Sequence, residues 1–254
     1  MSEFLIFALI GFLAQLCDGA LGMGFGVISS SVLLGLGVPP ALASASVNAA
    51  KIPTTATAAL SHLYHRNLEW ELVSALCIFG GIGGALGMLL LTGLKGTLLT
   101  TLLSAYLLLV GGLIIARGLR GVAPRVLPSA WKRSIGFAAG GLIEGIGGSW
   151  GPIVTTSLMG AGTESRFAIG STNFAEFFVS VTVFTAYASA FLLGHWEGGA
   201  DWHTVAMPVA GLVIGGLPAA FFGGMLSKIA PKRALTIAVG LLAVSIGIYR
   251  FLST

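Results

Sequence analysis

The chain has 254 residues, of which 56% are hydrophobic and only 9% are charged. Soluble domains carry about 25% charged residues, so a soluble globular enzyme is excluded, and the high apolar content excludes a disordered protein. The formal net charge of +4 fits a membrane protein whose cytoplasmic loops are rich in Lys and Arg. The composition therefore predicts an all-α protein that crosses a membrane several times.

Apolar stretches follow one another along the chain and cover 4–36, 40–61, 70–92, 97–116, 134–160, 167–194, 203–226 and 234–252. The longest polar segment, 117–133, holds five basic residues and divides the chain into similar halves. At six positions the residue is identical to the one that stands 125 positions later in the chain: 22, 26, 35, 37, 46 and 48. This repetition predicts a first transmembrane repeat over 1–116, a basic cytoplasmic linker over 117–133 and a second transmembrane repeat over 134–254.

The first apolar stretch of each half is interrupted by glycines. In 4–36, about 14 apolar residues precede the run DGALGMGFG, fewer than the roughly 20 that a spanning helix needs. Each stretch is either one broken spanning helix, giving parallel repeats, or a re-entrant hairpin of two helices, giving inverted repeats with about three further transmembrane helices each. The sequence leaves both models open.

The distribution of basic residues favours the hairpin model. With eight simple spans, the basic residues outside the spans divide seven to five between the two sides. With hairpins they divide ten to two, since only Lys95 and Arg250 lie opposite the others. Cytoplasmic loops are enriched in Lys and Arg, so we expect two inverted repeats with both chain ends outside the cytoplasm.

Four charged residues fall in the interior of predicted spans, where charge is costly and commonly functional: Asp18, Lys51, Glu144 and Glu176. Lys51 and Glu176 are related by the 125-residue offset, so inverted repeats would place their segments on opposite sides of the pseudo-twofold axis, near the middle of the membrane. Asp18, Glu144 and Glu176 are candidates for proton coupling, because desolvation favours the neutral form of a carboxyl group.

A new helix is expected to begin after each glycine run, and exposed N–H groups at helix starts bind anions. Two such starts, together with Lys51, predict a pocket for a small oxyanion. The candidate substrate-binding residues are Gly22, Met23, Gly24, Phe25, Gly26, Ser46, Asn48, Lys51, Gly148, Ser149, Trp150, Gly151, Ser171 and Asn173. The structural alternative is that the glycines only permit close helix packing and that Lys51 only pairs with Glu176.

Other chemistry finds less support in the sequence. His62 and His65 lie three apart, but they stand at a predicted span end beside Arg66 with no third ligand, so no metal site is expected. Ser149 is not expected to act as a hydrolase nucleophile, because GGSWG lacks the GxSxG spacing. We expect neither enzyme activity nor a cofactor.

The segments DGALGMGFGVISSSVLLGLGVPPALASASVNAAKIPTT and EGIGGSWGPIVTTSLMGAGTESRFAIGSTNFAEFF resemble the TauE/SafE sulfite exporter family. SHLYHRNLEW is similar to the family's SH…GN-(V/L)-DW segment, with Glu69 where the family has Asp. The resemblance covers both repeats and implies secondary transport of sulfite, sulfonates or related anions across the bacterial inner membrane.

Residues and resemblance together predict an inner-membrane secondary transporter, in the direction of export, of a small sulfur-containing anion such as sulfite or an organosulfonate like sulfoacetate. A passive anion channel or an uptake permease of the same architecture is the alternative. The expected partners are the anion and the lipid bilayer, without nucleic acid, and the apolar faces permit a homodimer.

Overall fold

The chain folds into a bundle of α-helices. The computed structural model describes residues 2–21, 23–93, 96–120, 130–160, 163–193, 202–229 and 232–252. Within these ranges there are ten helices and no strand, so the predicted all-helical class is confirmed. The helices are α1 (Ser2–Leu21), α2 (Phe25–Gly35), α3 (Pro40–Tyr64), α4 (Trp70–Gly93), α5 (Gly96–Arg120), α6 (Ala130–Gly147), α7 (Trp150–Gly160), α8 (Ser165–Leu192), α9 (Trp202–Ile229) and α10 (Lys232–Leu252).

Most predicted apolar stretches become one helix, whereas 4–36 and 134–160 each become two. In the described part of the chain, three segments are long and apolar enough to cross a membrane: Trp70–Gly93, Thr101–Arg120 and Phe167–Leu192. Shorter apolar helical segments cover Phe25–Gly35, Ser134–Gly147, Ala206–Ala220 and Thr236–Tyr249. This pattern of long and short apolar helices is that of a multi-pass membrane protein.

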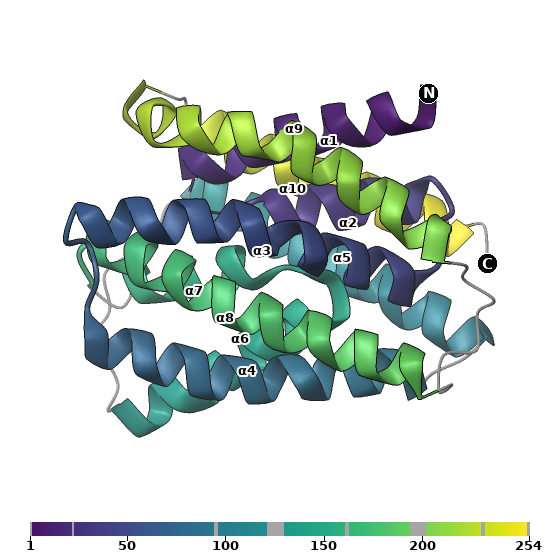
Figure 1. Cartoon of the computed structure of the whole chain (residues 1–254), viewed down its shortest axis with the longest axis horizontal. Helices are drawn as coiled ribbons and strands as arrows, with labels where there is room; N and C mark the ends of the chain where they lie inside the picture. The colour runs from purple at the N-terminus through teal and green to yellow at the C-terminus, as the bar shows by residue number, and fades with distance from the viewer. Residues whose placement is uncertain are drawn as a thin grey trace.

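The two halves of the chain are interleaved. Helix α1 packs along α9, and α6 packs along α4, so the first helix of each half pairs with a helix of the other half (Figure 1). Glycines permit these contacts, because a Cβ atom at Gly11 would overlap the carbonyl group of Leu212 and one at Gly83 would overlap that of Ala138. Two further cross-pairs, α3 with α8 and α5 with α10, complete the bundle.

The paired helices have definite relative directions. In α4 and α6 the contacts run from Gly80 with Gly141 to Gly87 with Gly145, so these helices are parallel. Helices α3 and α8 are antiparallel in Figure 1. Helix α1 begins and α10 ends at one end of the bundle, which we call the terminal end (Figure 1). At the other end, called the basic end, α3, α5 and α9 end and α4, α6, α8 and α10 begin.

Several element boundaries differ from the expected ones. Helix α1 has 20 residues, about 30 Å, and continues through Asp18 to Leu21, so this piece is longer than the sequence suggested. The Asp18 side chain is buried and bonded within the protein, which removes the reason for the helix to end before it. Helix α5 extends through Arg120 and α6 begins at Ala130, so both edges of the predicted linker are helical. Residues 121–129 lie outside the described ranges.

A cavity of about 700 Å³ opens near the terminal end. The start of α1, the turn between α2 and α3, and α9 form its walls, which include Phe7, Gly37, Leu42 and Met207. Glu3 is the charged residue in this lining. The cavity therefore lies on the terminal side of the site described next, because Leu42 precedes Lys51 by nine residues along α3.

Candidate functional site

The two glycine-rich breaks meet in the interior of the bundle. Gly24 precedes α2 with φ of 143°, and Gly148 precedes α7 with φ of 68°, which are conformations that glycine adopts readily. A Cβ atom at Gly26 would overlap the carbonyl oxygen of Gly148, so the two breaks touch through their backbones. Met23, Gly26 and Gly151 are buried beside them. Gly22 was expected to belong to this site and lies outside the described residues.

A carboxylate from the preceding helix caps each of the two short helices. The backbone N–H of Phe25 donates to Asp18 Oδ1 at 3.2 Å, and that of Trp150 donates to Glu144 Oε2 at 2.8 Å. Phe25 and Trp150 are 125 positions apart, so the arrangement recurs in both halves. Negative charge is favourable at a helix N-terminus. Each of these N–H groups, which the sequence predicted to be available to an anion, is therefore occupied by the protein's own carboxylate.

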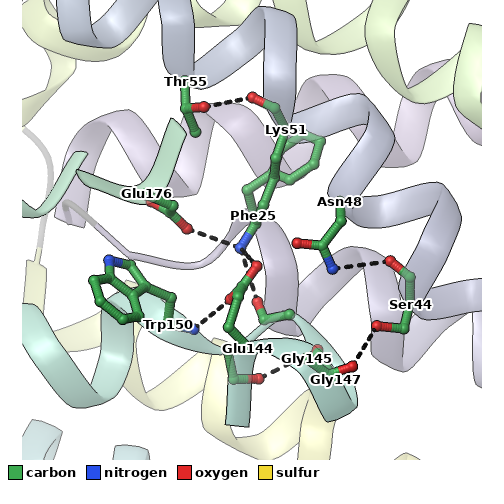
Figure 2. Close-up of polar contacts among 12 residues, drawn as sticks. Phe25, Ser44, Asn48, Lys51, Thr55, Glu144, Gly145, Gly147, Trp150 and Glu176 are labelled. Carbon is green, nitrogen blue, oxygen red and sulfur yellow. Dashed lines mark hydrogen bonds and ion pairs between the residues drawn. The ribbon is translucent and has the colours of Figure 1, made fainter. Parts of the chain in front are cut away.

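Lys51 lies between the two breaks and is almost completely buried, with 1% of its surface exposed. Its Nζ atom donates to Glu144 Oε1 at 2.8 Å, to Glu176 Oε1 at 2.8 Å and to the carbonyl oxygen of Gly148 at 3.0 Å, as Figure 2 shows. An ammonium group has three N–H donors, so all of them are used. In this structure Lys51 is therefore paired within the protein. The sequence analysis named Glu176 as a partner, and Glu144 is a second one.

The buried charges do not balance if all the groups ionise. Asp18, Glu144 and Glu176 are buried acids, and Lys51 is the one buried base among the described residues. A fully ionised cluster would have a net charge of −2, which is costly in a low-dielectric interior. Uptake of protons by the carboxyl groups would lower this cost, and Lys51 is the one buried positive charge among the described residues.

Helix α3 presents a stripe of polar residues toward α6. Ser44 Oγ donates to the carbonyl oxygen of Gly145 at 3.0 Å, and Asn48 Nδ2 donates to the carbonyl oxygen of Ser44 at 3.0 Å (Figure 2). Beyond Lys51, Thr55 Oγ1 donates back to the Lys51 carbonyl at 2.6 Å. Positions four or seven apart share a helix face, which explains the alignment. Ser46, also expected at the site, is buried and lies two residues from Asn48, hence on the other side of α3.

The candidate residues of the second half are engaged with protein partners. Ser171 Oγ accepts a hydrogen bond from the backbone N–H of Glu69 at 3.0 Å, and Asn173 Nδ2 lies 3.5 Å from His62 Nε2. Ser149 Oγ accepts a hydrogen bond from the hydroxyl of Tyr106. The first two contacts join α8 to the end of α3 and to the segment before α4, on the side of Lys51 toward the basic end. The third contact joins α5 to the second break.

Trp150 has its backbone at the site and its ring in the core. The side chain is fully buried, its Nε1–H donates to the carbonyl oxygen of Thr172 at 3.3 Å, and Cβ atoms added at Gly80 or Gly140 would meet the ring. Its position there stabilises the packing of α7 against α4, α6 and α8. A direct contact of the indole with a substrate stays a prediction.

The sequence analysis did not identify two residues that make hydrogen bonds at the site, Ser44 and Tyr106. Ser44 stands four residues before Asn48, so the helical spacing that selected Asn48 also points to Ser44. Tyr106 gave no such signal, because it lies in an ordinary apolar span and reaches Ser149 only through tertiary packing. Around His62, as elsewhere in the described ranges, no group of three His, Cys, Asp or Glu side chains is placed to hold a metal.

An all-helical multi-pass fold around a buried lysine and three buried acids is that of an integral membrane protein with a charged interior. Residues 7–250 match the family model Sulfite exporter TauE/SafE, and the chain belongs to this family. It is 38% identical over 221 residues to the probable membrane transporter protein YtnM of Bacillus subtilis (strain 168), which covers 84% of this chain and 72% of that protein. No solved structure matches.

Proposed function

We propose that this protein is a secondary transporter of the bacterial inner membrane that exports a small sulfur-containing anion, such as sulfite or an organosulfonate. The observation that carries this proposal is the buried Lys51, held by Glu144 and Glu176 at the crossing of two helix breaks. A cation at the centre of the bundle offers a binding partner for an anion. The sulfur chemistry rests on family membership.

The arrangement of the helices supports two inverted repeats. Inverted repeats exchange their pairing partners, and here α1 pairs with α9 as α6 pairs with α4. The equivalent helices α3 and α8 run in opposite directions (Figure 1). The ten basic residues counted for the cytoplasmic side belong, in sequence, to helix ends and connections at the basic end. We therefore assign the basic end to the cytoplasm by the positive-inside rule.

This orientation can be tested by labelling. In a Cys17→Ala/Cys77→Ala background, a cysteine at exposed Leu119 should react with a membrane-impermeant thiol reagent only from the cytoplasm. A cysteine at exposed Leu252 should react only from the outside. Reaction of both positions from the same side would contradict the inverted repeats.

In the proposed transport cycle, the carboxylates and the anion compete for Lys51. Without substrate, Glu144 and Glu176 neutralise the ammonium group. Protonation of either carboxyl group removes its negative charge and leaves the lysine to an incoming anion. Proton and anion then occupy the site together and cross the membrane together. Where metabolism makes the anion abundant in the cytoplasm, net movement is outward.

Proteoliposome counterflow is the decisive test. Vesicles loaded with unlabelled sulfite or sulfoacetate should accumulate the labelled anion above its outside concentration, and a pH indicator should report co-movement of protons. A passive channel gives no counterflow. Rapid uptake of the anion without counterflow would therefore favour the channel. The matched control is Lys51→Ala, which should show no flux, whereas Lys51→Arg keeps the charge and should retain part of it.

A further inference from the structure

Polar atoms without hydrogen-bond partners gather on one side of Lys51. Buried hydroxyl and amide groups normally find partners, and those that do not indicate a missing water or ligand. In the described part of the structure, the unpartnered buried atoms are Oγ of Ser29, Ser30, Ser31, Ser46 and Ser180, Oγ1 of Thr172 and Oδ1 of Asn48. Except for Thr172, these lie on the terminal side of Lys51 and Glu176, since α3 runs toward the basic end and α2 and α8 run away from it (Figure 1).

Ser30 and Asn48 face the same turn. Ser30 follows Gly26 by four residues on α2, and its Oγ is 3.2 Å from the position that a Cβ atom at Gly148 would take. On α3, Asn48 lies between Ser44, which bonds to Gly145, and Lys51, which bonds to Gly148. Both side chains therefore border the last turn of α6 and the break that follows it.

The free atom of Asn48 is an acceptor, and the hydrogen bonds determine this. Its Nδ2 donates to the carbonyl oxygen of Ser44, so a flipped amide would place oxygen against oxygen. Figure 2 shows the amide oxygen on the side of Lys51. The three donors of Lys51 are already used by Glu144, Glu176 and Gly148, so the lysine has none left for Asn48. Since none of the described side chains donates to this oxygen, a bound water or ligand can supply its donor.

We propose that Ser30 and Asn48 are substrate-binding residues that select an oxyanion carrying a hydrogen-bond donor of its own. This inference rests on the proposed function and adds to it a class of substrate. The Ser30 hydroxyl donates to an oxygen of the anion, as Lys51 does once a carboxylate is released. Asn48 Oδ1 accepts from an O–H or N–H of the same molecule. Hydroxyl- or amino-substituted sulfonates and singly protonated oxyanions such as hydrogen sulfite share this chemistry.

The first experiment compares two probes of nearly equal shape. Binding of 2-hydroxyethanesulfonate and of 1-propanesulfonate, which has a methyl group in place of the hydroxyl, to the detergent-purified protein is measured by calorimetry. The wild type should bind the hydroxylated probe about tenfold more tightly, the ratio that one hydrogen bond to a buried group gives. In Asn48→Leu the ratio should fall to about one. Because the ratio compares two ligands on one protein, a general loss of stability does not alter it.

The second experiment isolates the serine. Ser30→Ala should weaken both probes about tenfold while leaving their ratio unchanged. Ser31→Ala is the matched control, since its hydroxyl is equally buried and unpartnered but points about 100° further round α2. Its affinities should equal those of the wild type, and thermal unfolding of both variants should show that they are folded.

The outcomes separate this inference from the proposed function. Equal binding of the two probes by the wild type, or a preference that persists in Asn48→Leu, overturns the inference and leaves the anion transporter standing. If sulfite binds and neither sulfonate does, the donor is the proton of hydrogen sulfite, and Asn48→Leu must weaken sulfite about tenfold. Unchanged sulfite affinity then overturns the inference. Failure of all three anions to bind overturns both proposals.

Discussion

The two helix breaks share one backbone design but differ in what surrounds them. At the first break, Asp18 accepts from the N–H of Phe25 at 3.2 Å. At the second, Glu144 accepts from the N–H of Trp150 at 2.8 Å and also binds Lys51, which reaches the Gly148 carbonyl as well. The two breaks are therefore capped in the same way, but of their two capping carboxylates only Glu144 of the second break is joined to Lys51 in an ion pair. Substitutions at the two breaks should have correspondingly unequal effects.

Lys51→Ala is expected to have the largest effect. Removing one partner of a buried ion pair costs about 3–5 kcal/mol, because the remaining charge is buried without compensation. Here two carboxylates, Glu144 and Glu176, lose their cation together. Thermal and chemical unfolding in detergent would measure the loss of stability.

The matched rescue is the triple variant Lys51→Ala/Glu144→Gln/Glu176→Gln, which removes the charges as a set. It should recover much of the stability but not anion binding. If Lys51→Ala keeps both its stability and its affinity for sulfite, the lysine is neither a structural ion-pair partner nor the anion ligand.

Gly26→Ala should cause the second largest loss of stability, because Gly26 lies where the two breaks touch. The added Cβ atom meets the backbone carbonyl of Gly148, which cannot move without displacing α7, so we expect a loss of about 3 kcal/mol. Gly112→Ala is the control, because nothing lies within 4 Å of a Cβ atom there. That variant should be as stable as the wild type, and equal melting temperatures for the two variants would show that the breaks do not touch.

Glu144→Gln tests the second break alone. The amide can accept from the Trp150 N–H or face Lys51 with its oxygen, but it cannot do both well. Loss of one charge-assisted hydrogen bond is expected to cost about 2 kcal/mol of unfolding free energy, measured by denaturant titration in mixed micelles. A variant as stable as the wild type would mean that the charge of Glu144 adds nothing to the contacts with Trp150 and Lys51.

Asp18→Asn tests the first break and should have the smallest effect. The amide oxygen can still accept from the Phe25 N–H, so only the charge at the helix N-terminus is lost, which costs about 0.5 kcal/mol. The same denaturant titration measures this difference. A loss as large as that of Glu144→Gln would show that the two breaks are energetically equivalent and would remove the asymmetry described above.

A second comparison concerns the two sides of Lys51. Toward the basic end, Ser171 accepts a hydrogen bond from the backbone N–H of Glu69, and Asn173 lies beside His62. Toward the terminal end, Ser30 and Asn48 keep polar atoms without protein partners. Among the described residues, Thr172 is the one unpartnered buried side chain on the basic side, so our further inference places the substrate on the terminal side, where the others lie.

The sequence by itself determined the membrane class, the order of the apolar segments and the recurrence of residues at an offset of 125, because these depend on local hydrophobicity and spacing. It also selected Asp18, Lys51, Glu144 and Glu176, since charge within an apolar span is conspicuous. Only the tertiary structure decided which of these residues meet. That Glu144 caps α7 while binding Lys51, that Tyr106 reaches Ser149, and that Asn48 Oδ1 has no donor all depend on side-chain positions across helices distant in the chain. Local sequence patterns do not encode those distances, because they arise only when interleaved helices pack.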